Sequence, residues 1–177
     1  MQITGGKYNS RKIKTEEFEN IKPTLSKTRQ GIFNTLGAMI DFEGKVFFDM
    51  FSGSGIMSLE AISRGFNAVL FEKDKKTALA IKSAFKSMNL TPQLYFGDTL
   101  KNVVKIDIQA DVIFLDPPYN SNLYEQSLTV IKSNNKLKEN GIIVMEHPVD
   151  KQINTDGFKL IKVKIYGNKQ ITYLNNL

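Results

Sequence analysis

The sequence predicts an α/β fold in which helices cover both faces of a mainly parallel sheet. Short apolar runs alternate with segments of helical period between residues 26 and 145, and Gly or acidic residues follow several of the apolar runs. This alternation favours a parallel sheet, because each connection between parallel strands crosses one face of the sheet. The chain closes with two extended runs joined by Gly167-Asn168, a pattern typical of a hairpin. We therefore expect a seven-stranded sheet whose last strand is antiparallel.

The expected elements follow in chain order. Weak alternation around Gly5-Gly6 and Asn9-Ser10 predicts a small hairpin or arm over residues 1–14. A helix is expected over 26–39, with Ser26 as its N-cap. Strands are expected at 46–50, 68–71, 94–96, 112–115 and 141–145, followed by the closing pair 158–166 and 170–174. Further helices are expected from Ile56 to Gly65, over 74–88, after Asp98 and over 122–132.

Length and composition favour one domain over residues 1–177, with a basic arm or hairpin at 1–25 and an α/β core at 26–177. Apolar residues make up 41% of the chain, too many for a disordered protein. No apolar run approaches the roughly 18 residues of a membrane helix, and the N-terminus lacks the apolar stretch of a signal peptide. We therefore expect a cytoplasmic protein without membrane contact. The absence of Cys and the single His147 exclude thiolate and multi-histidine metal sites, so no metal is expected.

Positive charge is concentrated at the two ends of the chain. Residues 1–29 contain seven Lys or Arg and three Glu, and residues 157–177 contain four Lys and no acid, whereas the middle has 13 basic and 15 acidic residues. This distribution is expected when the ends bind a polyanion, although a solvated lysine-rich surface would have it too. The RNA contacts that we expect on this ground come from Arg11, Lys12, Lys14, Lys27 and Arg29.

Polar groups follow the first three strands of the predicted core. Asp49-Met50-Phe51-Ser52-Gly53-Ser54-Gly55 is a turn whose glycines let the backbone approach a ligand, and Ser58 completes a G-x-G-x-x-S pattern. Glu72 ends the next strand, where a carboxylate can accept hydrogen bonds from both hydroxyls of a ribose. Asp98 can accept from an adenine amino group while it caps a helix. Since the carboxyl ends of parallel strands share one edge of a sheet, we expect a nucleoside-containing cofactor there, either NAD or S-adenosylmethionine.

The fourth strand ends in Asp116-Pro117-Pro118-Tyr119. The prolines make a rigid loop that presents the Asp116 carboxylate and the Pro117 carbonyl as acceptors beside the Tyr119 ring. Two acceptors can hold both hydrogens of a planar NH2 group while the ring stacks on its base. They also stabilise the positive charge that develops when the nitrogen attacks a methyl group. The loop favours S-adenosylmethionine as the cofactor and, because the chain has no Cys nucleophile, direct methyl transfer to nitrogen.

Taken in order, D-M-F-S-G-S-G, F-E-K-D, G-D and L-D-P-P-Y resemble the class I S-adenosylmethionine-dependent methyltransferases, whose fold is Rossmann-like. More narrowly, the chain resembles the RsmD family of bacterial 16S rRNA guanine-N2 methyltransferases. The segments I-T-G-G-K-Y-N-S-R-K-I, K-P-T-L-S-K-T-R-Q-G-I-F-N-T-L, S-G-I-M-S-L-E-A-I-S-R-G and Y-G-N-K carry this resemblance over nearly the whole chain. The chain departs from the family pattern at Ser10, Lys22, Ser26 and Gln30, which concern details of the arm.

The resemblance implies a substrate, 16S rRNA in a partly assembled small subunit, and a role for each site residue. We also expect a monomer. The methionine part of the cofactor would be lined by Asp49, Phe51, Ser52, Gly53 and Gly55. Glu72 would hold the ribose and Asp98 the adenine, and the loop Asp116-Pro117-Pro118-Tyr119 would hold the target base. The residues implied at the mouth of the site are Thr24, Thr28 and Arg29, and Thr24 is expected to contact the RNA there.

Three alternatives stay open. Another planar NH2 group, adenine N6 or a glutamine amide, fits the same loop, although the chain has no room for the separate target-recognition region usual in DNA adenine enzymes. An NAD-dependent oxidoreductase would leave Asp116–Tyr119 without a role. A catalytically silent RNA-binding module would not need an intact D-P-P-Y sequence.

Overall fold

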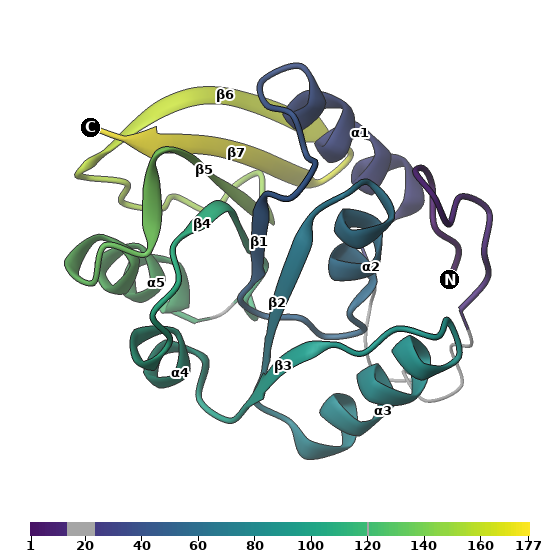
Figure 1. The fold of residues 1–177 in the computed structure, drawn as a ribbon. Helices are drawn as coiled ribbons and strands as arrows, with labels where there is room; N and C mark the ends of the chain where they lie inside the picture. The colour runs from purple at the N-terminus through teal and green to yellow at the C-terminus, as the bar shows by residue number, and fades with distance from the viewer. Residues whose placement is uncertain (14–23, 120) are drawn as a thin grey trace.

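The computed structural model describes residues 1–13, 24–119 and 121–177, in which helices flank a seven-stranded sheet (Figure 1). The strands are β1 (Val46–Asp49), β2 (Asn67–Glu72), β3 (Gln93–Phe96), β4 (Ala110–Leu115), β5 (Leu137–Pro148), β6 (Phe158–Tyr166) and β7 (Lys169–Asn176). The helices are α1 (Ser26–Gly37), α2 (Ile56–Ser63), α3 (Lys75–Lys86), α4 (Thr99–Lys105) and α5 (Leu123–Ser133).

The sheet has the order β3-β2-β1-β4-β5-β7-β6. Strands β1 to β5 run parallel, and β7 pairs antiparallel with β5 on one side and with β6 on the other. The predicted mainly parallel sheet with an antiparallel last strand is therefore confirmed. The order of the strands reverses between β1 and β4, and ligands of open α/β sheets bind beyond the carboxyl ends of the strands at such a switch point.

Two apolar layers cover the central strands. Phe47 of β1 packs in the core that includes α1 and α2, and the next residue, Phe48, packs in the core that includes α4 and α5. Successive side chains of a strand point to opposite faces, which explains why neighbouring phenylalanines serve different layers. α3 lies beside α2, where Ile81 and Phe85 are buried. Both faces of the sheet are therefore covered, as the near-continuous apolar runs of the strands predict.

The predicted N-terminal hairpin is present over residues 1–13. Gln2 and Lys12 form an antiparallel bridge, and Ile3 and Ile13 are buried in the apolar cluster that contains residues of α2 and α3. Lys14 and the remainder of the arm to residue 23 lie outside the described residues. The division of the chain at residue 25 stays a prediction.

Most boundaries lie within two residues of those expected, and two of the differences have an identifiable cause. The N-cap of α1 is Leu25, without a side-chain cap, because Ser26 lies inside the helix and its Oγ accepts a hydrogen bond from Arg29. β5 begins at Leu137, ahead of the apolar run 141–145, since the ion pair between Lys138 and Asp111 holds its polar beginning against β4. No helix among the described residues is long and apolar enough to cross a membrane.

Candidate active site

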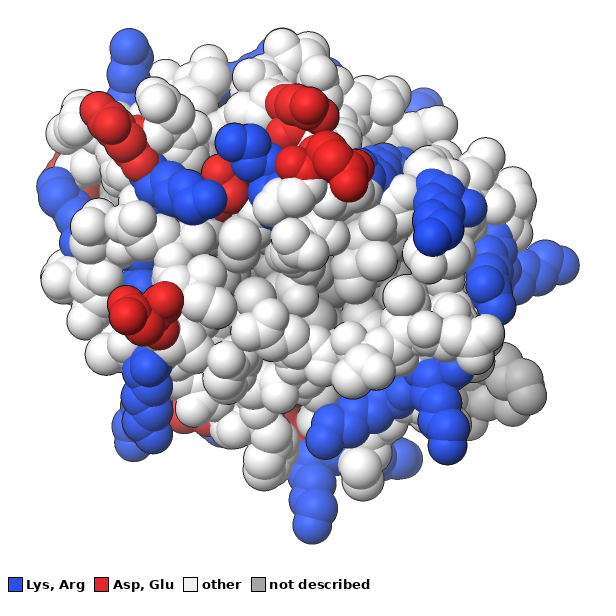
Figure 2. Space-filling view, viewed as in Figure 1, with Lys and Arg blue, Asp and Glu red and all other residues white. Residues whose placement is uncertain are grey.

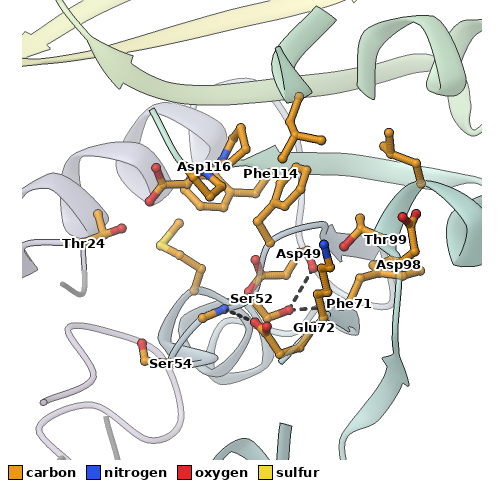
Figure 3. Close-up of a pocket in the computed structure, with 18 of the residues that line it drawn as sticks. Thr24, Asp49, Ser52, Ser54, Phe71, Glu72, Asp98, Thr99, Phe114 and Asp116 are labelled. Carbon is orange, nitrogen blue, oxygen red and sulfur yellow. Dashed lines mark hydrogen bonds between the residues drawn. The ribbon is translucent and has the colours of Figure 1, made fainter. Parts of the chain in front are cut away.

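A cavity of about 610 Å³ opens beyond the carboxyl ends of β1, β2 and β4 (Figure 3). The sequence-predicted residues that line it are Thr24, Asp49, Phe51, Ser52, Gly53, Glu72, Asp98, Asp116, Pro117, Pro118 and Tyr119. Figure 3 places Asp116 and Thr24 on one side of the view, Asp98 and Thr99 on the other, and Asp49 between them. Residues from four strand ends, far apart in the sequence, thus share one cavity.

The turn after β1 exposes backbone to this cavity. Gly53 and Gly55 have φ values of 50° and 71°, in the left-handed region that favours glycine. Gly55 is the N-cap of α2 and does not itself line the cavity. Ser52 fixes the turn, because its Oγ donates to the carbonyl of Asp49 and accepts from the amide of Phe71 on β2. The turn is therefore held at both adjacent strands and presents Gly53 to the cavity.

Asp49 is a buried carboxylate in the wall of the cavity, with 1% of its surface exposed. Burial raises its pKa to about 7; the hydrogen bond from Ser58 opposes this rise, and the charges of Glu72 and Asp116 add to it. The distance between Ser58 Oγ and Asp49 Oδ2 is 2.7 Å. The sequence singled out Ser58 only as a small residue of the turn, and the structure makes it the hydroxyl that holds Asp49.

Glu72 and Asp98 are ordered by backbone amides. Glu72 Oε2 accepts from the amide of Gly53 at 2.9 Å, and its Oε1 accepts from the amide of Asp74 at 2.8 Å. Burial raises the pKa of Glu72, and these amide hydrogen bonds oppose the rise. Asp98 is exposed and caps α4, where its Oδ1 accepts from the amide of Lys101 at 3.0 Å. The predicted N-cap is confirmed, and each carboxylate oxygen keeps a further lone pair for a ligand.

The loop after β4 presents a half-buried carboxylate and an exposed ring. Burial raises the pKa of Asp116, and the positive charge of Lys169 opposes the rise. Pro117 is buried and Pro118 is exposed, while Tyr119 keeps 38% of its surface exposed. The arrangement can offer acceptors and a stacking surface to a planar group that enters the cavity.

The sequence analysis missed the lysines that contact this loop. Lys169 Nζ lies 4.1 Å from the centre of the Tyr119 ring and 2.9 Å from Glu146 Oε1. Lys151 Nζ donates to the carbonyl oxygens of Tyr119 and Ser121. Both lysines are at least 30 residues away from the loop, so no local pattern connects them to it. Only the assignment of β7 next to β5 could have brought Lys169 to this end of the sheet.

The cations predicted to contact RNA are found in different settings. Lys27, Arg11 and Lys12 are exposed, whereas Lys14 lies outside the described residues. Thr24 is buried in the cavity wall. The surface position expected for Arg29 is wrong, because only 2% of its surface is exposed.

Arg29 is buried because it links three parts of the molecule. Its Nε forms an ion pair with Glu60 of α2 at 3.1 Å, and its Nη atoms donate to the carbonyl oxygens of Gln2 and Thr24. Glu60 also accepts from Thr4 of the hairpin and from Arg64. A buried charge is tolerated when it is paired and hydrogen-bonded. Arg29 therefore connects the hairpin, α2 and the cavity wall, and it cannot reach a phosphate without losing this network.

No cluster of three or more His, Asp or Glu within residues 1–13, 24–119 and 121–177 is arranged to hold a metal ion. His147 is buried, and its Nε2 lies 2.9 Å from Thr172 Oγ1. This contact agrees with the structural role that an isolated histidine usually has.

Comparison with known proteins identifies the family. The model of the family described as "Conserved hypothetical protein 95" matches residues 1–175. The chain is 35% identical over 153 residues to the "Putative rRNA methyltransferase YlbH" of Bacillus subtilis (strain 168), covering 83% of this chain and 82% of that protein. It is 30% identical over 177 residues to "Ribosomal RNA small subunit methyltransferase D" of Haemophilus influenzae, covering 94% and 89%.

A solved structure has the same fold. The "Putative methyltransferase yhhF from Escherichia coli" superposes with a TM-score of 0.85 at 22% identity, and the match covers 99% of this chain and 97% of that one. This similarity shows that the fold is the Rossmann-like fold of class I methyltransferases. Together with the match over residues 1–175 and the relatives at 30% identity or more, it shows that the chain belongs to the RsmD family of methyltransferases.

Proposed function

We propose that this protein transfers a methyl group from S-adenosylmethionine to the N2 amino group of a guanine in 16S rRNA of the small ribosomal subunit. The observation that carries the proposal is the shared cavity, in which the groups suited to a nucleoside and the loop suited to a planar amine face the same space. Family membership supports an rRNA methyltransferase. The oxidoreductase alternative is disfavoured because it gives no role to the loop Asp116–Tyr119.

The residues of the cavity fit S-adenosylmethionine. Asp49 is a buried carboxylate without a cationic partner among its described contacts, and it can pair with the ammonium group of the methionine part. Glu72 can accept from the ribose hydroxyls and Asp98 from the adenine amino group. When bound, the cofactor supplies a methyl group on a positively charged sulfur. The residues of this chain orient that cofactor and exclude water from its methionine part.

The target base is held by the loop after β4. The Asp116 carboxylate and the Pro117 carbonyl accept from the two hydrogens of the guanine amino group, which directs the nitrogen lone pair out of the ring plane. The Tyr119 ring stacks on the base. The negative charge of Asp116 then faces the positive charge that develops on nitrogen, and positioning contributes much of the remaining acceleration. A guanine must leave its stack to enter, which favours an unpaired nucleotide.

RNA contacts are proposed for a surface made by the hairpin and α3. The hairpin and α3 carry seven Lys or Arg and no acid in residues 1–13 and 75–86. Arg11 joins the two elements, because its Nη2 donates to the carbonyl of Ser87 just after α3. On the face shown in Figure 2, blue side chains gather at the right and at the lower right, where Figure 1 draws the hairpin and α3. The middle of the chain is slightly acidic overall, but the lysines of α3 add to the basic surface that the N-terminal hairpin begins.

Two measurements test the proposed function. Small-subunit particles from cells that lack this protein should accept label from tritiated S-adenosylmethionine when the purified protein is added. Mass-spectrometric mapping of their 16S rRNA should place one new methyl group on guanine N2. Label on an adenine, or on a protein glutamine, would replace the proposed acceptor with one of the other planar amines, and no transfer at all would contradict methyl transfer to this particle.

A further inference from the structure

We propose that Lys169 is a positioning residue for the target base, and that it acts together with Lys151 as a two-lysine clamp on the loop Asp116–Tyr119. The proposal rests on the function proposed above and extends it to the closing hairpin. Lys169 is the first residue of β7 and Lys151 follows β5, so both belong to the last third of the chain. The rest of the proposed base-binding machinery lies in the loop itself.

The two lysines contact different parts of the loop. Lys151 Nζ donates to the carbonyl of Tyr119 at 2.9 Å and to that of Ser121 at 3.2 Å, so it holds the backbone. Lys169 Nζ lies over the Tyr119 ring at 4.1 Å from its centre, so it holds the side chain. A cation within about 6 Å of an aromatic ring is attracted to the face of that ring. The clamp thus fixes the loop through two independent contacts.

Glu146 sets the position of Lys169. This glutamate is buried in β5, with 3% of its surface exposed, and its Oε1 lies 2.9 Å from Lys169 Nζ. Glu146 pairs in register with Ile171 of β7, which places Lys169 two residues before the paired position. A buried ion pair has little freedom, because separation would leave a charge without its partner. The ammonium group of Lys169 is therefore fixed relative to the sheet and not merely attracted to the loop.

This placement matters for stacking. Lys169 covers one face of the Tyr119 ring, and the ring still lines the cavity with 38% of its surface exposed. A base can then stack on the face that the lysine leaves open. Because the ring is oriented before the base arrives, less conformational freedom is lost on binding.

Lys169 also acts on the charge of Asp116. The titratable groups around Asp116 come from four elements: Asp49 of β1, Glu146 of β5, Tyr124 of α5 and Lys169 of β7. Burial favours the protonated form of Asp116, and Lys169 favours the carboxylate. The carboxylate is the form that accepts a hydrogen bond from the amino group. Its negative charge also stabilises the positive charge that develops on the nitrogen. Lys169 therefore keeps Asp116 ready for the base.

The experiment compares Lys169→Met and Lys169→Arg with Lys151→Met as the matched control. The first readout needs no RNA: the protonation midpoint of Asp116, followed by carbon NMR of its carboxyl group in each purified variant. We expect Lys169→Met to move the midpoint upward by about 1 unit or more. Lys169→Arg should leave it near the wild-type value because the charge is kept. Lys151→Met should leave it there too, since that lysine holds backbone carbonyls.

The second readout is the pH dependence of kcat/KM for methylation of small-subunit particles. Lys169→Met should shift the acidic limb in the same direction as the midpoint, whereas Lys151→Met should raise KM for the particles without a shift. If Lys169→Met does not fold because Glu146 loses its ion pair with Lys169, Lys169→Met combined with Glu146→Gln replaces it, and the midpoint should again rise. A folded variant without Lys169 that has an unchanged midpoint and an unchanged acidic limb would overturn the proposal, leaving only a structural ion pair. If wild-type protein fails to methylate the particles, the proposed function fails, and the Asp116 midpoint alone still decides whether Lys169 acts on that carboxylate.

Discussion

Asp49 and Asp116 stand at the ends of neighbouring strands and have different partners. Both carboxylates have their pKa raised by burial. Asp49 is held by an uncharged hydroxyl, Ser58, and its pKa reaches about 7. The rise at Asp116 is opposed by a cation, Lys169. The comparison teaches that two aspartates at one edge of a sheet can suit different ligands. Asp49, held by a neutral hydroxyl, suits a cationic ligand group, and Asp116, beside a lysine, suits a neutral amine.

The largest expected effect comes from removing the Asp116 carboxylate. Asp116→Ala should lower turnover on the order of 10²-fold or more, since one oriented acceptor at a developing charge contributes roughly 3 kcal/mol. Affinity for S-adenosylmethionine, measured by calorimetry, should stay close to wild type because Asp116 is proposed to hold the base. Turnover of Asp116→Asn should fall by a similar factor. Its amide oxygen still accepts a hydrogen bond, but the negative charge opposite the developing cation is lost. If Asp116→Ala methylates small-subunit particles at near wild-type turnover, the proposal that Asp116 holds the base while Asp49 holds the cofactor is contradicted.

Asp49→Asn should have the opposite pattern and should alter stability with pH. The folded pKa of Asp49, about 7, is above the ordinary value of 3.8, so the folded state binds more protons between these values. Stability contributed by this group is full below pH 4 and is lost as pH rises through 7. Asn does not titrate, so the variant should gain about 2–3 kcal/mol relative to wild type between pH 5 and pH 8.

Urea unfolding at the two pH values measures this gain, and calorimetry of the same variant should detect weakened binding of S-adenosylmethionine. Parallel pH dependence in variant and wild type would show that Asp49 does not titrate in this range. Unchanged cofactor affinity would instead contradict its proposed pairing with the ammonium group.

A smaller effect is expected when the hydroxyl partner of Asp49 is removed. Ser58 stabilises the charged form of Asp49 through the 2.7 Å hydrogen bond. Ser58→Ala should therefore destabilise the protein by about 1–3 kcal/mol at pH 8, where the carboxylate is charged, and by less at pH 5. Unfolding curves at both values provide the measurement, with Ser54→Ala as a control in the same turn. An equal loss at both pH values would assign Ser58 to packing alone.

The smallest effect is expected far from both aspartates. Replacement of Arg11, Lys12 and Lys14 with Ala should raise KM for RNA several-fold and change turnover at saturation less, because these residues are proposed to contact phosphates. The logarithm of RNA affinity should fall with the logarithm of salt concentration, and the slope should be smaller in the variant. Kinetics identical to wild type would leave the hairpin without a role in RNA binding.

Short-range patterns in the sequence predicted the helices, the strands and the residues of the cavity. The features that they did not predict depend on partners far away in the chain. Helix and strand periods repeat within a few residues, so the order of elements could be predicted, together with the strand ends that carry Asp49, Glu72 and Asp116. Arg29 was expected to contact RNA because it belongs to the basic N-terminal part of the chain, but it is buried and paired. Its partner Glu60 is 31 residues away and lies on another helix, which no local pattern shows.

By itself, the sequence determined the α/β fold, the candidate cofactor edge and the acceptor loop, because each depends on residues that are near one another in the chain. The tertiary structure alone decided which partner each charged group has: Arg29 pairs with Glu60, Asp49 accepts from Ser58, and Lys169 pairs with Glu146 and acts on Asp116. Electrostatic effects depend on distance and burial, and both are set only when remote elements pack. A sequence pattern can therefore identify the carboxylates of a site, but their protonation depends on the neighbours and the burial that the fold gives them.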